Sequence, residues 1–153
     1  MLPGFYMFGE SFQYDANFIA QHTLPKNGGI SVLDFPMQKA MVGVFESADS
    51  DYSDLEEVLY LQHGPYNNPY DLTTFYDNHD MARMNASDNG FIDAHNWLFT
   101  ARGIPVVYQG SEMGFMRGTS EHSGNRNMYG QANIDAAKSH KIHHALSRIA
   151  NIR

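Results

Sequence analysis

The residues best suited to chemistry form one run, Asp77-Asn78-His79-Asp80, directly after a segment, Leu72–Tyr76, whose residues favour a buried strand. Four consecutive polar groups at the end of a strand are costly to bury unless each finds a partner. This segment alone leaves two interpretations open. Asp and Asn are ordinary turn residues, and Asp80 could cap a helix. Alternatively, the run belongs to a functional site.

Polar residues also occur at the ends of the other segments that are predicted to be strands. Gly9-Glu10-Ser11 follows the first strand, Asp34 lies near the end of the second, and Gln109–Glu112 follows the fourth. In parallel α/β folds the functional site lies at the carboxyl ends of the strands. The placement of these residues therefore favours a site.

Apolar runs and helix-breaking residues divide the chain into alternating strands and helices. The predicted strands are Phe5–Phe8, Ile30–Phe35, Leu72–Tyr76 and Ile104–Tyr108. The predicted helices are Asp15–His22, Met37–Phe45 after Pro36, Leu55–Gln62 with Ser53 or Asp54 as N-cap, Asp88–Arg102 and Ile134–Ile149. Because the strands are nearly continuous apolar runs, we expect them to be buried on both faces of a parallel sheet. The prediction is one α/β domain, residues 1–153, with four strands, which is about half of a (β/α)8 barrel.

The composition excludes several classes of protein. Of the 153 residues, 42% are hydrophobic and 18% are charged, which is typical of a folded globular domain. The net charge of −7 makes nucleic acid an unexpected partner. No apolar run approaches the roughly 18 residues that span a bilayer, so no membrane partner is expected. There is no Cys, which excludes disulfides and thiolate chemistry but does not settle the compartment.

Four segments, in this order, resemble the α-amylase family, glycoside hydrolase family 13. Phe8-Gly9-Glu10 resembles its motif at barrel strand five, and SVLDFP (Ser31–Pro36) resembles strand six. FYDNHD (Phe75–Asp80) resembles the strand-seven motif, and GIPVVYQGSE (Gly103–Glu112) resembles strand eight. The family's strand-four motif, Gly-x-Arg-x-Asp, which carries the nucleophile, does not occur in this sequence. The resemblance therefore implies the C-terminal half of the catalytic barrel, strands five to eight.

The resemblance assigns catalytic roles to two carboxylates. Glu10 corresponds to the general acid/base of a retaining glycosidase, and we expect apolar surroundings that raise the pKa of its carboxyl. Asp80 corresponds to the carboxylate that binds sugar hydroxyls and stabilises the transition state. His79 would hydrogen-bond the same glucosyl unit. Each has a plainer alternative: Glu10 as a capping or solvated residue, and His79 as a structural histidine.

The resemblance also assigns substrate contacts to two further residues. Phe12 stands two positions after Glu10, where transglycosylating members carry an aromatic residue on the acceptor side, although it could equally be part of the core. Arg126 lies in a segment, His122–Gly130, that resembles a loop contacting donor-side sugars, although it could be a solvated arginine. Asp77 and Asn78 are interpreted as residues that orient the turn.

No metal ligand and no cofactor are predicted in this chain. Calcium, which family members often hold, would be bound in the full-length parent by residues from the absent half. His140, His143 and His144 stand at helical spacing, but we interpret them as a solvated helix face rather than as a zinc site.

The predicted activity of the parent enzyme is hydrolysis of α-1,4-glucosidic bonds in starch-like glucans. Two alternatives remain: a transglycosylase of the cyclodextrin-glucanotransferase type, and a non-catalytic amylase-like module that binds carbohydrate or a partner chain. Because the nucleophile region is missing, the isolated chain is expected to be inactive.

The expected partners are an α-glucan or maltooligosaccharide and a second polypeptide surface. A half barrel leaves sheet edges and apolar side chains uncovered, so we expect self-association or pairing with the missing N-terminal half. The sequence does not give the compartment; the resemblance suggests an extracellular or periplasmic parent.

Overall fold

The computed structural model describes residues 5–127 and 129–152, and within them the chain forms four short parallel strands. These are β1 (Phe8–Gly9), β2 (Ser31–Val32), β3 (Thr73–Thr74) and β4 (Ile104–Pro105). β1 pairs with β2 and β3 pairs with β4, and a parallel bridge between Leu33 and Thr73 joins the two pairs. The spatial order therefore follows the chain order, and the carboxyl ends of all four strands point the same way.

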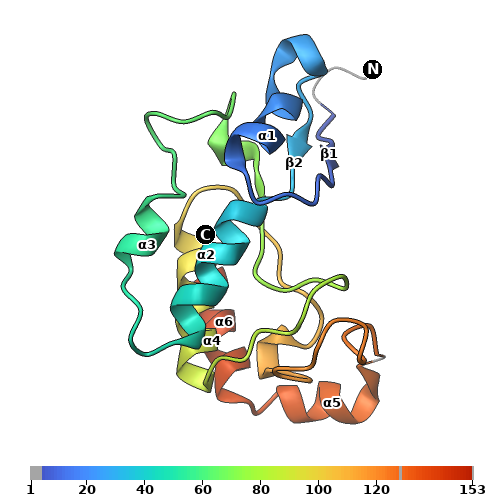
Figure 1. Cartoon of the computed structure of the whole chain (residues 1–153). Coiled ribbons are helices and arrows are strands. Elements are labelled where there is room, and N and C mark those ends of the chain that lie inside the picture. Colours follow the sequence, from blue (N-terminus) through green and yellow to red (C-terminus); the bar gives the residue numbers. More distant parts are fainter. Residues whose placement is uncertain (1–4, 128, 153) are drawn as a thin grey trace.

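Helices connect these strands and form most of the core. They are α1 (Ala16–Ala20), α2 (Phe35–Glu46), α3 (Ser53–Glu56), α4 (Asp88–Thr100), α5 (Gly130–Ala137) and α6 (Lys141–Ala150), with 3₁₀ turns at Gln21–Thr23, Pro25–Asn27, Pro69–Asp71 and Ser111–Met113. Helix α4 packs against both α2 and α6. In Figure 1, α2, α4 and α6 lie together below β1, β2 and α1. None of the helices in the described residues has the length and apolarity to cross a membrane.

Helix α2 begins earlier than predicted because Asp34 caps it. The Asp34 carboxylate accepts a hydrogen bond of 3.1 Å from the Met37 N–H, and Pro36 occupies the first turn. The prediction of a strand through Phe35 is therefore wrong at its end: Asp34 leaves the strand and Phe35 is already helical.

Two further predictions were wrong about the helices. The helix expected over Leu55–Gln62 is only the short α3, because the carbonyl groups of Val58 and Leu59 accept hydrogen bonds from Arg102 instead of continuing a helix. The single helix expected over Ile134–Ile149 is split into α5 and α6. His140 is extended and its ring nitrogen Nδ1 accepts a hydrogen bond of 3.3 Å from the Ile142 N–H, which starts a new helix.

The strands are less uniformly buried than their apolar sequences predicted. The central residues Leu72 and Thr74 are buried, whereas Phe8 is 54% exposed and Val106 is 43% exposed. The exposed side chains stand on or beside β1 and β4, which are the outer strands and have one neighbour each. Full burial of these strands would need a further layer or strand beside them.

The close approach of β3 and β4 requires glycine at position 103. Gly103 has a φ of +92°, and a Cβ atom there would lie 2.4 Å from the Thr74 Cγ2 and 2.8 Å from the Leu72 carbonyl oxygen. Any other residue would both strain the backbone and push the two strands apart.

A buried ion pair joins the parts of this fold. The Arg102 Nη1 lies 2.6 Å from the Asp34 Oδ2, and both side chains are fully buried. The same guanidinium donates to the carbonyls of Val58 and Leu59. Burial raises the pKa of Asp34, and the charge of Arg102 opposes that rise. The pair thus fixes the end of β2 and the end of α4 to the segment after α3.

Removing the arginine from this pair should be strongly destabilising. Arg102→Met leaves a buried carboxylate without its partner, so we expect the free energy of unfolding to fall by about 3 to 5 kcal/mol in urea denaturation. Arg117→Met is the matched control, because its pair with Asp88 (2.5 Å) is about one-third exposed and should contribute less than about 1 kcal/mol. Equal losses in the two variants would contradict this ranking.

Candidate active site

The polar run after β3 divides into a buried part and an exposed part. Asp77 is 3% exposed, whereas His79 is exposed and Asp80 is partly exposed. The next helix, α4, begins only at Asp88 and is capped by Ser87, so the interpretation of Asp80 as a helix cap is wrong. Residues 77–80 therefore form a turn in which Asp77 is buried and the side chains of His79 and Asp80 reach solvent.

Asp77 is the buried anchor. Its Oδ1 accepts a hydrogen bond of 2.8 Å from the Met84 N–H, and its Oδ2 accepts one of 3.1 Å from the Ser111 hydroxyl. The Arg83 guanidinium lies 4.0 Å from Oδ2. Burial raises the pKa of Asp77 to about 6, although these three contacts favour the ionised form. The expectation that Asp77 orients the turn is consistent with these contacts.

Arg83 ties the turn to the segment that follows β4. Its side chain is buried; Nη1 donates to the Gln109 carbonyl at 2.9 Å and Nη2 donates to the Asn125 carbonyl at 3.4 Å. The guanidinium also lies over the Tyr108 ring, 4.3 Å from its centroid. Sequence reasoning did not single out this residue.

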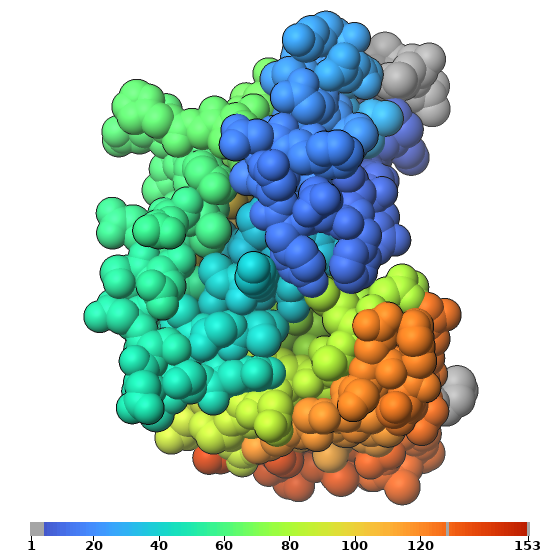
Figure 2. Space-filling view, viewed as in Figure 1, coloured from blue at the N-terminus to red at the C-terminus, as the bar shows by residue number. Residues whose placement is uncertain are grey.

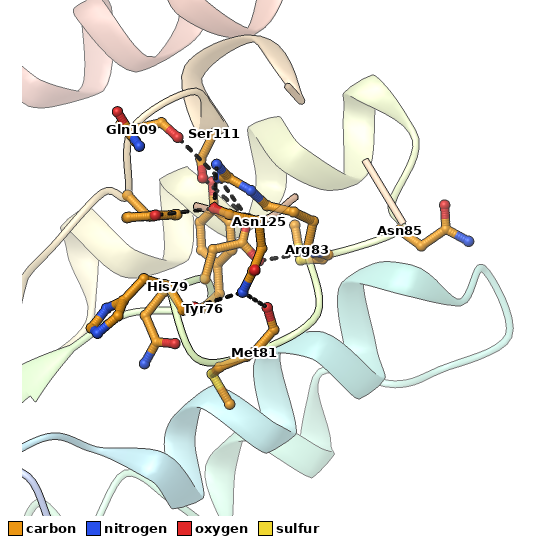
Figure 3. Close-up of polar contacts among 12 residues, drawn as sticks. Tyr76, His79, Met81, Arg83, Asn85, Gln109, Ser111 and Asn125 are labelled. Atoms are coloured by element: carbon orange, nitrogen blue, oxygen red, sulfur yellow. Dashed lines mark hydrogen bonds and ion pairs between the residues drawn. The ribbon is translucent and has the colours of Figure 1, made fainter. Parts of the chain in front are cut away.

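Asn125 holds the backbone of the turn directly. The Asn125 Nδ2 donates to the carbonyl of His79 at 2.7 Å and to that of Met81 at 2.9 Å, as Figure 3 shows. Asn125 is 1% exposed, and its own carbonyl accepts from the Tyr108 hydroxyl at 3.0 Å. Sequence reasoning missed this residue although it named its neighbour Arg126, because nothing local marks a contact between segments 44 residues apart.

Three of the predicted site residues lie together on the outer side of the turn. The His79 Nε2 is 3.1 Å from the Asp80 Oδ2, and the Arg126 Nη2 pairs with the Asp80 Oδ1. The Arg126 Nε also donates to the His79 carbonyl at 3.0 Å. All three side chains reach solvent. The cluster therefore presents one carboxylate flanked by two cationic or donor groups, which suits a ligand rich in hydroxyls.

Glu10 and Phe12 follow β1 at the same end of the sheet. Phe12 is 52% exposed and lines a groove of about 410 Å³ together with Asp80. Glu10 is exposed and lines a separate hollow of about 140 Å³ with residues that include His22 and Val32. The apolar surroundings expected for Glu10 are therefore absent in this structure. Because β2 lies between β1 and β3, Glu10 and Asp80 follow strands that are not immediate neighbours.

A second polar contact lies beneath the turn and was not predicted. The Tyr76 hydroxyl lies 2.6 Å from the His95 Nε2, and both residues are fully buried. Burial lowers the pKa of His95 to about 4, so the ring is neutral near pH 7. Among the described residues, no three His, Cys, Asp or Glu side chains converge as a metal site would require.

The raised pKa of Asp77 gives a pH dependence with a definite sign. Because the folded state binds this proton more tightly than the unfolded state, the carboxyl stabilises the fold below its ordinary pKa of 3.8, and this contribution is lost as the pH rises through about 6. Asp77→Asn keeps an acceptor for Met84 but does not titrate. Between about pH 4 and about pH 7, we expect the stability of the unmodified chain relative to Asp77→Asn to fall by about 2 to 3 kcal/mol. Urea unfolding of both proteins across this range measures it, and a difference that is constant or rises with pH would contradict it.

Comparison with known proteins places this arrangement in a family. A family model described as the α-amylase catalytic domain matches residues 2–148. A cyclomaltodextrin glucanotransferase from Bacillus sp. (strain 1-1) is 34% identical over 111 residues, which cover 70% of this chain and 16% of that protein. Another, from Geobacillus stearothermophilus, is 28% identical over 155 residues, which cover 97% of this chain and 20% of that protein.

Solved structures agree with the sequence comparison. An α-amylase from Geobacillus thermoleovorans, complexed with acarbose, superposes with a TM-score of 0.75 at 27% identity, covering 97% of this chain and 34% of that one. A γ-CGTase from alkalophilic Bacillus clarkii superposes with a TM-score of 0.78 at 25% identity, covering 95% of this chain and 21% of that one. The chain thus spans about a third or less of the length of these relatives. It belongs to the α-amylase family of glycoside hydrolases, as an α/β segment of the catalytic domain.

Proposed function

We propose that this chain is the C-terminal half, strands five to eight, of the barrel of a retaining enzyme that hydrolyses α-1,4-glucosidic bonds in starch-like glucans. The observation that carries the proposal is the cluster of His79, Asp80 and Arg126 at the carboxyl end of β3, in a chain of this family. Sugars present hydroxyl groups as donors and acceptors, and this cluster offers both in return. The order of the strand-end segments along the chain supports strands five to eight.

In this proposal the two carboxylates divide the chemistry. Glu10 donates a proton to the leaving glycosidic oxygen and later removes one from the attacking water, while Asp80 holds sugar hydroxyls and stabilises the oxocarbenium-like transition state. The pairing of Asp80 with Arg126 and His79 holds the carboxylate in a fixed orientation.

None of the carboxylates at the ends of β2 and β3 is assigned the role of the attacking nucleophile. Retaining hydrolysis needs a second carboxylate about 5 to 5.5 Å from the acid, which forms a glycosyl–enzyme bond. Asp80 is engaged as described, Asp77 is buried beneath the turn, and Asp34 is bound to Arg102. The resemblance assigns the nucleophile to the strand-four motif, which this sequence lacks, so we place it in the N-terminal half of the barrel.

Transglycosylation is the second candidate, and two observations favour it. Cyclomaltodextrin glucanotransferases are among the relatives, one of them at 34% identity. Phe12 is exposed on the groove that Asp80 lines, where its ring could hold an acceptor sugar against displacement by water. Incubating the full-length enzyme with starch separates the two reactions, because cyclic products mark a transferase and linear oligosaccharides mark a hydrolase.

Binding without catalysis is the third candidate, because Glu10 and Asp80 line different hollows in this chain. Calorimetry with maltooligosaccharides addresses it. Affinity at millimolar concentration or tighter that is lost in His79→Ala, combined with no turnover by the full-length enzyme, would replace the catalytic proposal with a binding role.

The chain alone should not hydrolyse starch at a useful rate. Without a nucleophile the glycosyl–enzyme step cannot occur, and the loss is typically several orders of magnitude in turnover. We expect reducing-sugar release to appear when the N-terminal half is supplied in trans or fused, and to vanish again with Glu10→Gln. Turnover by the isolated chain that depends on Glu10 would show that the assignment of a missing nucleophile is wrong, whereas turnover that survives Glu10→Gln indicates a contaminating amylase.

The exposed strand residues should make the isolated chain associate. The outer strands expose apolar side chains, with Phe8 54% and Val106 43% accessible, and their free edges can pair with another strand. We expect light scattering to detect dimers or larger species, and Val106→Lys to reduce them. Tyr52→Lys, which changes another exposed apolar side chain (54% exposed) immediately before α3, is the control. A stable monomer at all concentrations would contradict this.

A further inference from the structure

The groove that contains Asp80 extends well beyond that residue. It has a volume of about 410 Å³, within the range of roughly 300 to 1,000 Å³ that is typical of small-ligand sites. Its lining includes Phe12, Tyr14, Lys39, Asp80, Arg83 and Glu121. In Figure 2 the blue segment after β1 lies above the cyan surface of α2, with the yellow-green and orange surface of the residues near 80 and 120 beside it.

Two aromatic rings form a fixed wall of this groove. The Phe12 ring lies 4.4 Å from that of Phe35 and the Tyr14 ring lies 5.9 Å from it, measured between centroids. Phe35 is fully buried and packs edge-on against Phe75 at 5.3 Å. Phe12 and Tyr14 nevertheless remain 52% and 39% exposed. The core therefore holds both rings in place while much of their surface stays accessible to a ligand.

Two hydrogen-bond donors beside this wall have no hydrogen-bond acceptor among the described residues. Neither the Tyr14 hydroxyl nor the Lys39 ammonium makes a hydrogen bond or ion pair with any residue that the structure describes; the ammonium lies only over the Tyr14 ring, 5.6 Å from its centroid. Partial burial, and then the charge of Glu121, raise the pKa of Tyr14, so its hydroxyl stays protonated. Both groups are therefore available as donors.

The acidic residues on the same groove are already engaged. The Glu46 carboxylate accepts a hydrogen bond of 2.6 Å from the Asn85 N–H, and the Glu121 carboxylate pairs with His122 at 2.9 Å. Asp80 is held by His79 and Arg126. The carboxylates of the groove are therefore paired, whereas the Tyr14 hydroxyl and the Lys39 ammonium can donate hydrogen bonds to the hydroxyls of a neutral polyol.

We propose that Tyr14 and Lys39 bind the glucosyl unit that adjoins the unit held at Asp80, by donating hydrogen bonds to its hydroxyls while the Phe12 ring packs against its apolar face. The inference rests on the proposed function, because it assumes an α-glucan at Asp80. It adds two residues that set the preferred length of the glucan, because only a ligand with a second unit reaches them.

The test compares ligands of increasing length on the full chain. Calorimetry gives the dissociation constants of glucose, which has a single unit, and of maltotetraose, and their ratio measures what the additional units contribute. We expect Lys39→Met to reduce this ratio about fivefold to tenfold and Tyr14→Phe to reduce it about threefold, as loss of single hydrogen bonds to a ligand predicts. Both substitutions are at accessible positions and keep the bulk of the side chain, so the fold should be retained.

Two controls separate the possible failures. Lys26→Met removes an exposed lysine outside the groove and should leave the ratio unchanged, whereas Asp80→Asn should weaken both ligands alike. An unchanged ratio in both Lys39→Met and Tyr14→Phe, with binding otherwise intact, would overturn this inference and leave the proposed function standing. An equal change in Lys26→Met would also overturn it, as an effect of net charge. If the unmodified chain binds neither ligand, this inference fails, whereas the proposed function is decided separately by the turnover of the fused enzyme.

Discussion

The buried pair of Asp34 and Arg102 is the constraint on which the rest of the architecture depends. Two opposite charges removed from water are tolerated only when their geometry is good and their remaining hydrogen-bonding groups find partners. Here the carboxylate also caps α2, and the guanidinium also binds the carbonyls of Val58 and Leu59. Three segments far apart in the sequence must therefore be in place together before either charge is satisfied, which specifies one arrangement of β2, α2 and α4.

The turn after β3 is also held by buried charged and polar side chains that bind distant parts of the chain. Asp77, Arg83 and Asn125 are buried and make hydrogen bonds to backbone groups of other segments, so they fix the path of the chain. The side chains of His79 and Asp80 pair with each other and, for Asp80, with Arg126, and all three reach solvent. The buried residues hold the backbone of the turn, and the Asp80 carboxylate therefore keeps its orientation although it is itself partly exposed.

Sequence reasoning recovered the features that local patterns encode. Alternating apolar runs predicted a parallel sheet, and the structure has one, with the polar residues that follow each run beyond the carboxyl ends of its strands. It failed where the decisive partner is distant: the helix after Ser53 stops early because of Arg102, more than 40 residues away, and Asn125 reaches the turn from 44 residues away. The break at His140 was also missed, because a side chain rather than a glycine or proline starts α6.

The stacking of Phe12 and Tyr14 on Phe35 has a consequence for the thermodynamics of ligand association. Side chains that a ligand must first immobilise each cost about 0.5 to 1.5 kcal/mol of conformational entropy on binding. These two rings are already held against a residue at the first turn of α2, so that entropy was lost when the chain folded. Association at this wall should therefore carry a smaller entropic penalty than a mobile aromatic loop would impose, and the preorganisation is tied directly to the cap that starts the helix.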